Sequence, residues 1–417
     1  MAPTSASDVF IPGGLPQATY VAREHLGIEQ RVSDWASGAH TSLLSVSGPT
    51  KTGKTVLLKR FFRDAVWFSG GAIETADEFW QAVADELEVY VELGLSVSGT
   101  REKGGGFEVG ANAGFASMGG SSNVAAASER GVTRGRTRPV KVAAREALQA
   151  AKEIVIIDDF HYIPQAEQVK IIRGLKDLIF EGVPFILVAV PHRAYDAVRV
   201  EKEMTGRVEN IALGQWDEDD LRKIPVLGFA ALSKNISEAI TDQLVAESFG
   251  SPHLMQTHCL ALAQASDDGT TVVEPDWDSF FRARAAAASK TAFDLLKQGP
   301  RQRNDRNIRR LKDGLETDIY GAVLAAVAST GPRTSLQYED LRTALRNVME
   351  SDLPQRHEVT NILEQMTKIS REKIPGEPVL EYDNEYSTLY IADPFFAYYL
   401  RWAPESMKEL AISRPQD

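Results

Sequence analysis

The sequence predicts an α/β protein: a parallel β-sheet flanked by helices, followed by a second half that is mostly helical. Two features of the first half carry this prediction. The runs Ile154–Ile157 and Phe185–Val190 are continuously apolar, which is typical of parallel strands buried on both faces. Between them, Gln165–Phe180 has apolar residues at helical spacing. From Asp217 to about Gln298 the pattern is helical throughout, so the sheet is expected in the first half.

The other expected elements follow the same patterns. Further strands of the sheet are expected at Ser42–Ser47, 64–71 and 207–214, and helices at about Glu24–Trp35, Lys54–Arg63 and 75–90. The second half shows helical patterns at Asp217–Ile224, Ser237–Phe249, Ser251–Ala263, Asp278–Leu296, Asp318–Ala328, Tyr338–Asn347 and His357–Thr367, and two short strands within 378–393. Three helices followed by a hairpin are the element order of a winged helix. The predicted domains are therefore a core over 1–214, a helical domain over 215–298 and a winged-helix domain over 299–417.

Composition limits the class of protein. The chain has 417 residues, of which 43% are apolar and 25% charged, which is enough for two or three globular domains. Its net charge of −12 argues against a protein that coats nucleic acid with its whole surface. Cys259 is the one cysteine, which excludes an intrachain disulfide and suits a reducing compartment. The sequence shows neither a signal peptide nor an apolar run of membrane-spanning length, so a cytoplasmic protein without membrane contact is expected.

A phosphate-binding loop follows the first predicted strand. Residues 48–55 read Gly-Pro-Thr-Lys-Thr-Gly-Lys-Thr and match the pattern G-x-x-x-x-G-K-[ST]. Gly48 and Gly53 allow the backbone N–H groups to turn toward phosphate oxygens, and the helix that follows adds its positive N-terminal end. Lys54 is expected to reach the β- and γ-phosphates, and the Thr55 hydroxyl to bind Mg²⁺. The whole loop, with Pro49, Thr50, Lys51 and Thr52, is therefore the expected nucleotide site; the alternative is a surface Gly/Lys loop.

An acidic pair completes the expected site. Asp158 and Asp159 come directly after the buried strand 154–157. Asp158 stands where a carboxylate that orients Mg²⁺ belongs, and Asp159 would activate the attacking water. Because aspartate is one carbon shorter than glutamate, hydrolysis is expected to be slow. Without the phosphate loop, two solvated acids at a strand end would be the simpler interpretation.

With these motifs the chain resembles the STAND ATPases and their archaeal-type relatives, which are close to the AAA+ proteins of the origin-recognition type. The acidic pair, an extra strand between loop and acid, and a helical segment before a winged helix carry the resemblance. It covers residues 15–265 well and 315–402 more loosely, where Ile391–Trp402 ("IADPFFAYYLRW") resembles the family's closing segment. STAND proteins usually also carry an effector domain and a repeat sensor. This sequence has neither, so a separate effector protein is an expected partner.

The resemblance implies further site residues. Tyr20 and Arg23, in "TYVARE", match the family segment that lies along the adenine, and Pro252, in "FGSPHLM", matches the lid proline that packs on the base. His192 or Arg193 fits loosely as a γ-phosphate sensor. Arg207 stands where related proteins carry an arginine finger that reaches the nucleotide of a neighbouring subunit, although a surface ion pair explains it equally well. Ser251 before Pro252 is also a helix N-cap signal.

Residues 91–141 interrupt the α/β order. Alternating residues at 91–97 and 107–115 predict a β-hairpin with residues 100–106 as its loop. A run of cations without acids follows at 130–141. The hairpin is interpreted as a surface or oligomer contact, with a membrane pore as the alternative. The cations are interpreted as a solvated linker, with contacts to nucleic-acid phosphates or to an acidic partner as alternatives. Residues 301–312 form a second basic segment.

These features together predict a P-loop ATPase that binds ATP and Mg²⁺ and acts as a molecular switch. Its nucleotide state would control the arrangement of the helical lid and winged helix, oligomerisation and engagement of a partner. The resemblance suggests a role in stress or phage defence. Two alternatives remain open: a DNA-associated ATPase that uses the winged helix and the basic segments, and a membrane-acting assembly that uses the hairpin at 91–118.

Overall fold

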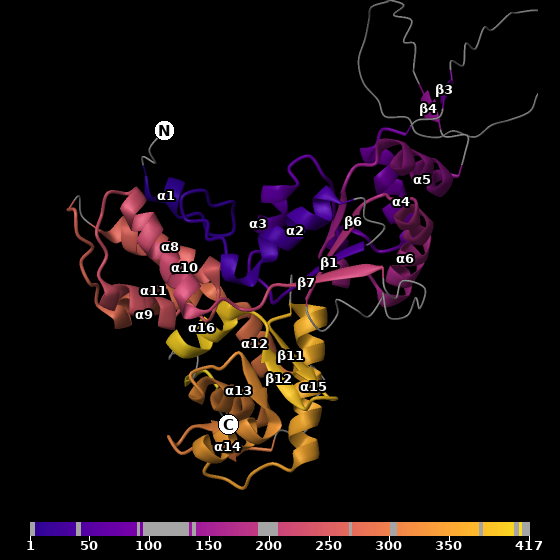
Figure 1. Ribbon diagram of the computed structural model, residues 1–417. Coiled ribbons are helices and arrows are strands. Elements are labelled where there is room, and N and C mark those ends of the chain that lie inside the picture. Colours follow the sequence, from indigo (N-terminus) through magenta and orange to yellow (C-terminus); the bar gives the residue numbers. More distant parts are fainter. Residues whose placement is uncertain are drawn as a thin grey trace, which may run out of the picture.

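The structure is a computed structural model that describes residues 5–38, 43–89, 92–94, 133–135, 139–190, 207–266, 269–300, 307–374, 378–403 and 408–410. Its first half is built on a parallel sheet, its middle is helical, and its C-terminal part combines helices with a small antiparallel sheet (Figure 1). Among the described residues, no helix combines the length and apolar character needed to cross a bilayer.

The central sheet has five parallel strands in the order β2-β5-β6-β1-β7. Their bounds are β1 Leu43–Ser47, β2 Val66–Ser69, β5 Val155–Asp158, β6 Phe185–Ala189 and β7 Val208–Ala212. The strand that ends in the acidic pair therefore lies two places from the strand that ends in the phosphate loop, with β6 between them. This sheet and its flanking helices form a P-loop NTPase fold, and the predicted fold class is confirmed.

Helices cover both faces of the sheet. On one face, α4 (Ala76–Glu86), α5 (Val140–Ala151) and α6 (Gln165–Phe180) pack on Val155 and Ile157. On the other face, α2 (Ile28–Ser37) and α3 (Lys54–Phe61) pack on Ile156, the residue between Val155 and Ile157 in the strand. Since neighbouring residues of a strand point to opposite faces, a continuous apolar run is required to bury both. The short helices of this half are η1 Glu24–Leu26, η2 Gly70–Ala72 and η3 Phe160–Tyr162.

The middle of the chain forms a helical layer beside this core. It consists of α8 Glu218–Ala231, α9 Glu238–Ala246, α10 Pro252–Ala265 and α11 Trp277–Ala288, whereas the next helix, α12 (Lys290–Gln298), packs mainly on the C-terminal part. The N-terminal helix α1 (Ala6–Val9) contacts α10, and the rings of Phe10 and Phe229 meet at 5.2 Å between centroids. The first residues of the chain thus pack on the helical layer, while the chain from α2 onward builds the sheet (Figure 1).

The C-terminal part begins with the two-stranded pair β8 (Arg309–Arg310) and β9 (Glu316–Thr317). Then follow α13 Ile319–Ser329, β10 Ser335–Gln337, α14 Tyr338–Val348, α15 Arg356–Lys373, β11 Leu380–Asp383, β12 Thr388–Ile391 and α16 Pro394–Trp402. The strands form an antiparallel sheet in the order β10-β12-β11. A single hydrophobic cluster joins this part to the helical layer, partly because α16 packs on α11.

Two expectations differ from the structure. The single helix expected at Asp278–Leu296 is two helices, α11 and α12, because Ser289 has φ −153° and ψ 25° and ends one before the other begins. In the insert, β3 (Glu92–Gly94) pairs antiparallel with β4 (Thr133–Gly135), a segment that was not predicted as a strand. The second predicted strand, at 107–115, and its loop lie outside the described residues, as does half of the basic run 130–141.

Candidate functional site

The phosphate loop connects β1 to α3 at the carboxyl end of the parallel strands. Gly53 has φ +95°, a region that residues with a Cβ rarely adopt, and it is the N-cap of α3. A Cβ on Gly48 would lie 2.5 Å from the carbonyl oxygen of Leu213. Each glycine is therefore required by a different constraint: one by its backbone angle and the other by the close approach of the neighbouring chain.

Lys54 is held inside the loop that it follows. Its side chain is buried, and Nζ donates hydrogen bonds to the carbonyl oxygens of Gly48 and Pro49 at 3.0 and 2.9 Å. The carbonyl oxygens that accept these hydrogen bonds are neutral, so they leave the ammonium its positive charge. The loop therefore presents a fixed cation next to the N-terminus of α3, where an anion is favoured.

The predicted metal pair is brought together across the sheet. The Thr55 hydroxyl, on the first turn of α3, donates to Oδ2 of Asp158, at the end of β5, at 2.9 Å. The other carboxylate oxygen of Asp158 accepts from the backbone N–H of Asp159 at 3.0 Å. Hydroxyl and carboxylate oxygens are the ligands that Mg²⁺ takes in proteins. The two side chains thus fit a shared Mg²⁺ site beside the loop.

Asp159 lies next to this pair in an unusual backbone conformation. Its φ is +54°, in the left-handed region, and it is the N-cap of the short helix η3. Its carbonyl oxygen packs on Gly70, where a Cβ would come within 2.3 Å. Burial and then the charge of Asp158 raise the pKa of the Asp159 carboxyl, and Lys54 opposes the rise. A carboxyl with a raised pKa that lines the cavity can accept a proton from water.

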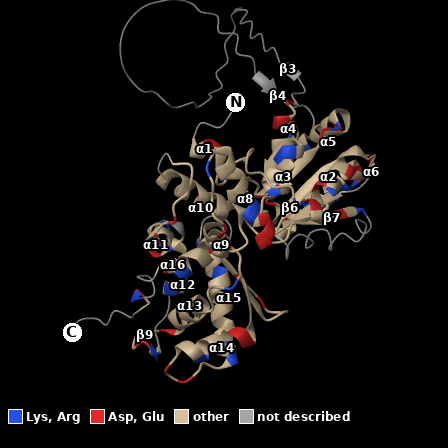
Figure 2. Ribbon diagram, turned by 60° about the vertical axis from the view of Figure 1, so that its left-hand side comes forward, with Lys and Arg blue, Asp and Glu red and all other residues tan. Residues whose placement is uncertain are grey.

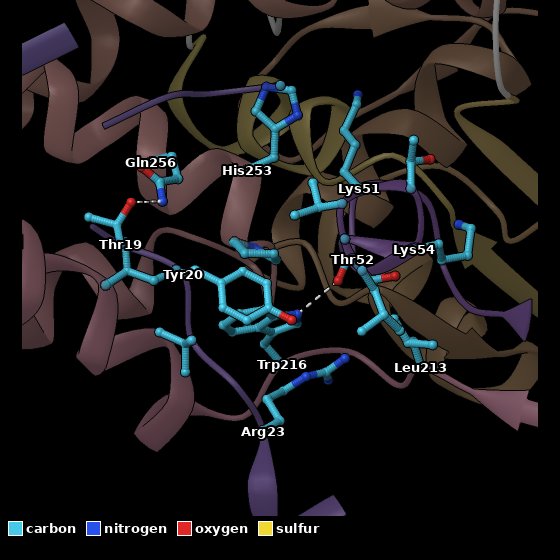
Figure 3. A pocket seen from close by; sticks show the side chains of 18 of the residues that line it. Thr19, Tyr20, Arg23, Lys51, Thr52, Lys54, Leu213, Trp216, His253 and Gln256 are labelled. Carbon is cyan, nitrogen blue, oxygen red and sulfur yellow. Dashed lines mark hydrogen bonds between the residues drawn. The ribbon is translucent and has the colours of Figure 1, made fainter. Parts of the chain in front are cut away.

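A cavity of 270 Å³ opens from the loop toward the helical layer (Figure 3). Its lining includes five loop residues, Lys51 to Thr55, together with Asp159. The three residues expected to contact the base, Tyr20, Arg23 and Pro252, also line it. Pro252 opens α10, whose N-cap Ser251 accepts from the N–H of Leu254 at 3.3 Å, so the cap prediction is confirmed. The cavity therefore joins the phosphate end to the predicted base end.

Two of these residues are fixed by polar partners. The Tyr20 hydroxyl donates to Glu29 on α2, and burial is the main reason that its pKa is raised. Arg23 donates to the carbonyl of Gly214 at 3.3 Å and lies 4.9 Å from the centre of the Trp216 ring. Burial lowers the pKa of Arg23, opposed mainly by Asp220. These contacts hold the cavity wall in place before any ligand arrives.

Some predicted residues lie elsewhere. Pro49 and Thr50 face away from the cavity, into a second one of 630 Å³ between the core and the C-terminal sheet. Arg207 precedes β7, where its backbone carbonyl accepts from Leu43, and its guanidinium lies over the exposed ring of Phe180 at 4.9 Å. That is the amino end of the parallel strands, opposite the loop. Arg193, like His192, lies outside the described residues.

Other residues of the cavity wall were not predicted. Trp216 donates its indole N–H to the carbonyl of Thr52 at 2.9 Å, which ties the chain after β7 to the loop (Figure 3). Gln256 of α10 donates to the hydroxyl of Thr19 at 2.7 Å. The position of Trp216, between the last strand and the first helix of the second half, was the available signal for it. Gln256 gave none, because it meets Thr19 only after 237 residues of chain.

The loop also contacts the C-terminal part of the chain. Nζ of Lys51 lies 2.7 Å from Oδ1 of Asp393, the N-cap of α16, and 4.4 Å from the centre of the Phe395 ring. His253, at the start of α10, packs edge-on against the same ring at 5.0 Å. Burial and then the charge of Lys51 lower the pKa of His253, while Asp393 opposes this. The phosphate loop, the helical layer and α16 therefore meet at one point.

Known proteins match this chain in their structure but not in their sequence. No protein-family model and no curated protein matches the sequence. A Walker-type ATPase of Pyrococcus abyssi is similar over 94% of this chain and 98% of its own, with a TM-score of 0.55 and 13% sequence identity. Cdc6p of Pyrobaculum aerophilum is similar over 97% and 98% of the two chains (TM-score 0.43, 12% identity), and the ORC2 protein of Aeropyrum pernix over 96% and 97% (TM-score 0.45, 12% identity). The likeness to the Pyrococcus protein shows a shared fold over almost the whole of both chains.

Proposed function

We propose that this protein is an ATPase that binds ATP with Mg²⁺ and uses its nucleotide state as a switch. One observation carries the proposal above the others. The Thr55 hydroxyl and the Asp158 carboxylate, 103 residues apart in the chain, meet at 2.9 Å beside the buried ammonium of Lys54. A metal ligand pair and a phosphate-binding cation next to one 270 Å³ cavity are what a nucleoside triphosphate with its cation requires.

Each residue has a role in this proposal. The loop N–H groups and Lys54 would hold the phosphates, while Thr55 and Asp158 would hold Mg²⁺, which neutralises the charge that develops on the transferred phosphoryl group. Asp159 would orient the attacking water and accept its proton. Tyr20, Arg23 and Pro252 would enclose the base. The preference for adenine rests on the resemblance in the sequence.

The switch is proposed from the contacts that surround the loop. α16 is bound at both ends: Asp393 pairs with Lys51 of the loop, and Arg401 and Trp402 bind the buried carboxylate of Glu247 in the helical layer. A phosphate that enters the loop would compete with Asp393 for the Lys51 ammonium. Loss of this pair would free one end of α16, and with it the C-terminal part, from the core.

The domain roles belong to the same proposal. The layer α8–α11 would be the lid, because α10 supplies Pro252, His253 and Gln256 to the cavity. The order α13, β10, α14, α15, β11, β12 is that of a winged helix and supports this interpretation of the C-terminal part. The proposed boundaries are 1–214, 215–298 and 299–417. Arg207 lies at the amino end of the parallel strands, opposite the loop, so it would act only on the nucleotide of a neighbouring copy in an oligomer.

The central test is nucleotide binding by Lys54→Ala. We expect a fluorescent ATP analogue to bind the wild-type chain with Mg²⁺ and to lose at least about 100-fold in affinity in the variant, because a charge-assisted phosphate contact in a buried site is removed. Lys170→Ala, which removes an exposed lysine of α6 paired with Glu167, is the matched control and should bind as the wild type does. Competition with unlabelled ATP and GTP gives the base preference. Retained affinity in Lys54→Ala would contradict the proposal.

A further inference from the structure

A third cavity lies along α3, next to the nucleotide cavity. It is a groove of 550 Å³ between α3, the start of β2 and the N-terminal segment 15–20, and we refer to it as the α3 groove. Tyr20 and Val56 line both the groove and the nucleotide cavity. The two cavities therefore share a wall, but none of the phosphate-loop residues 48–55 lines the α3 groove.

Three cations line this groove. Lys59 and Arg60 are exposed on α3, one turn beyond Val56, and Arg63 follows just after the helix ends. Among the described residues, no carboxylate is within ion-pair distance of any of the three, and neither Asp nor Glu lines the groove. Glu29 accepts from the Tyr20 hydroxyl but does not line the groove, and Asp64, beside Arg63 in the chain, is exposed and does not line it either.

This concentration of positive charge lies on a chain that is acidic overall. The chain as a whole carries a net charge of −12, and both basic and acidic residues are scattered over the ribbon (Figure 2). Many of the other cations, such as Arg145 and Lys170, pair with a carboxylate. Like charges placed close together repel one another unless an anion lies between them. The groove is therefore a local site for an anionic ligand.

Aromatic rings are interleaved with these cations. The Lys59 ammonium lies 5.4 Å from the centre of the Trp67 ring, and the Arg60 guanidinium lies 4.2 Å from that of Tyr20. Trp67, on β2, is only partly buried. Cations that follow a backbone, together with rings on which bases stack, are the two elements of sites for single-stranded nucleic acid. An acidic peptide would need the cations alone.

We propose that the α3 groove binds a single-stranded nucleic acid, with Lys59, Arg60 and Arg63 on its phosphates and the rings of Trp67 and Tyr20 beside its bases. The ligand would lie against the helix that follows the phosphate loop. Because Tyr20 also forms a wall of the nucleotide cavity, the strand and the nucleotide would occupy opposite sides of one side chain. This site is independent of the proposed ATPase activity and of the C-terminal part.

The test uses the full chain and a fluorescein-labelled single-stranded oligonucleotide of about 12 nucleotides. Binding is followed by fluorescence anisotropy at several salt concentrations. The variant is Lys59→Gln with Arg63→Gln, which leaves Arg60 and the nucleotide-cavity wall intact. The control is Arg145→Gln with Lys170→Gln, which removes the same charge from α5 and α6. Thermal unfolding of both variants shows whether they fold as the wild type does.

The salt dependence decides the outcome. Because each phosphate contact to a single strand contributes about 0.7 to the slope of log K against log salt, removing two contacts should lower the slope by about 1.4, while the control keeps the wild-type slope. An abasic strand of equal length should bind about tenfold more weakly than the normal strand, since stacking on the rings is lost. The same slope in the groove variant and the wild type, or no binding by either, would overturn the proposal.

A competition experiment separates the ligand classes. Polyglutamate of equal charge should displace the labelled strand poorly if bases contribute to binding. Displacement as strong as that by the unlabelled strand would assign the groove to an acidic protein segment and overturn the nucleic-acid proposal. The groove variant should bind the fluorescent ATP analogue as the wild type does. Oligonucleotide binding therefore tests the groove, and binding of the ATP analogue tests the ATPase proposal separately.

Discussion

The sheet that carries the phosphate loop and the helical and C-terminal parts that contact it are built in different ways. In the sheet, each functional side chain is placed by its own strand or helix: Thr55 by α3, and Asp158 and Asp159 by the end of β5. In the helical layer and the C-terminal part, the residues that contact the loop, Trp216 and Asp393, are more than 150 residues away from it in the chain. The chemical groups are thus fixed by local structure, whereas the groups that would respond to the ligand are fixed by packing.

This difference predicts which contacts a ligand would replace. The sheet has a hydrophobic cluster on each face, so its loop ends are held by a rigid base. The helical layer and the C-terminal part share one cluster and touch the loop mainly through polar contacts. Polar contacts near a surface are weaker than buried apolar packing and are replaced more easily by a ligand. Variants on the two sides should therefore fail differently.

The largest effect is expected from Asp159→Asn on the sheet side. Asparagine has the same shape and tolerates the left-handed backbone at φ +54°, but it does not accept the proton from water. Single-turnover hydrolysis of ATP should slow by about 10²- to 10⁴-fold while nucleotide affinity is unchanged. An unchanged rate would exclude Asp159 as the base and leave water activation to another group.

A large effect on stability is expected from a buried histidine in α10 of the helical layer. Burial lowers the pKa of His258, which packs between Phe281 and Tyr398, from its ordinary value of 6.5 to about 4. The unfolded chain therefore binds a proton between pH 6.5 and 4 that the folded chain does not. Stability from this residue is complete above pH 6.5 and is lost as the pH falls to 4, by about 3 kcal/mol in all.

The measurement is the free energy of unfolding by urea across this pH range. His258→Gln should remove the steep part of the acid loss, although it lowers stability at neutral pH. His357→Gln changes an exposed histidine at the start of α15 and should keep the wild-type profile. Parallel profiles for the wild type and His258→Gln would show that carboxylates alone cause the acid loss.

A smaller effect is expected at the contact between the two regions. Lys51→Met keeps the apolar stem over Phe395, and Asp393→Asn keeps an N-cap for α16, so the pair removes the charges with little other change. Because both side chains are partly exposed, their coupling in a double-mutant cycle should be about 1 kcal/mol in the free energy of unfolding. The same cycle in saturating ATP should give a smaller coupling energy, since phosphate would compete with Asp393 for Lys51. Additive effects in both conditions would remove the pair from the switch.

The smallest effects compare one helix cap from each region. Thr75→Ala removes the N-cap of α4 beside the sheet, and Ser251→Ala removes the N-cap of α10 in the helical layer. Each should cost about 1 kcal/mol in the free energy of unfolding. Ser251→Ala should also weaken ATP binding a few-fold, because α10 begins with Pro252 and His253 at the cavity. Equal ATP affinity in the two variants would argue that α10 does not close on the nucleotide.

Much of the sheet side was predictable because its signals are local. The glycine spacing of the loop, the apolar runs of β5 and β6 and the acids that follow β5 each reflect the physics of one short segment. Helix α6 was predicted at Gln165–Phe180 and has those bounds in the structure. The break at Ser289 was missed because the apolar spacing continues through it. The pairing of β3 with β4 was missed because β4 lies in a basic run without the alternation of a strand.

The sequence by itself determined which groups can bind phosphate and metal, since glycine, lysine, threonine and aspartate at fixed spacing have few other uses beside a buried strand. Only the tertiary structure decided what surrounds them. It placed Trp216 and Gln256 on the cavity wall, turned Pro49 and Thr50 away from it, put Arg207 at the opposite edge of the sheet and joined Lys51 to Asp393 across 342 residues. The reason is physical: a hydrogen-bonded turn is specified by neighbouring residues, whereas a contact between distant segments depends on how all the intervening elements pack.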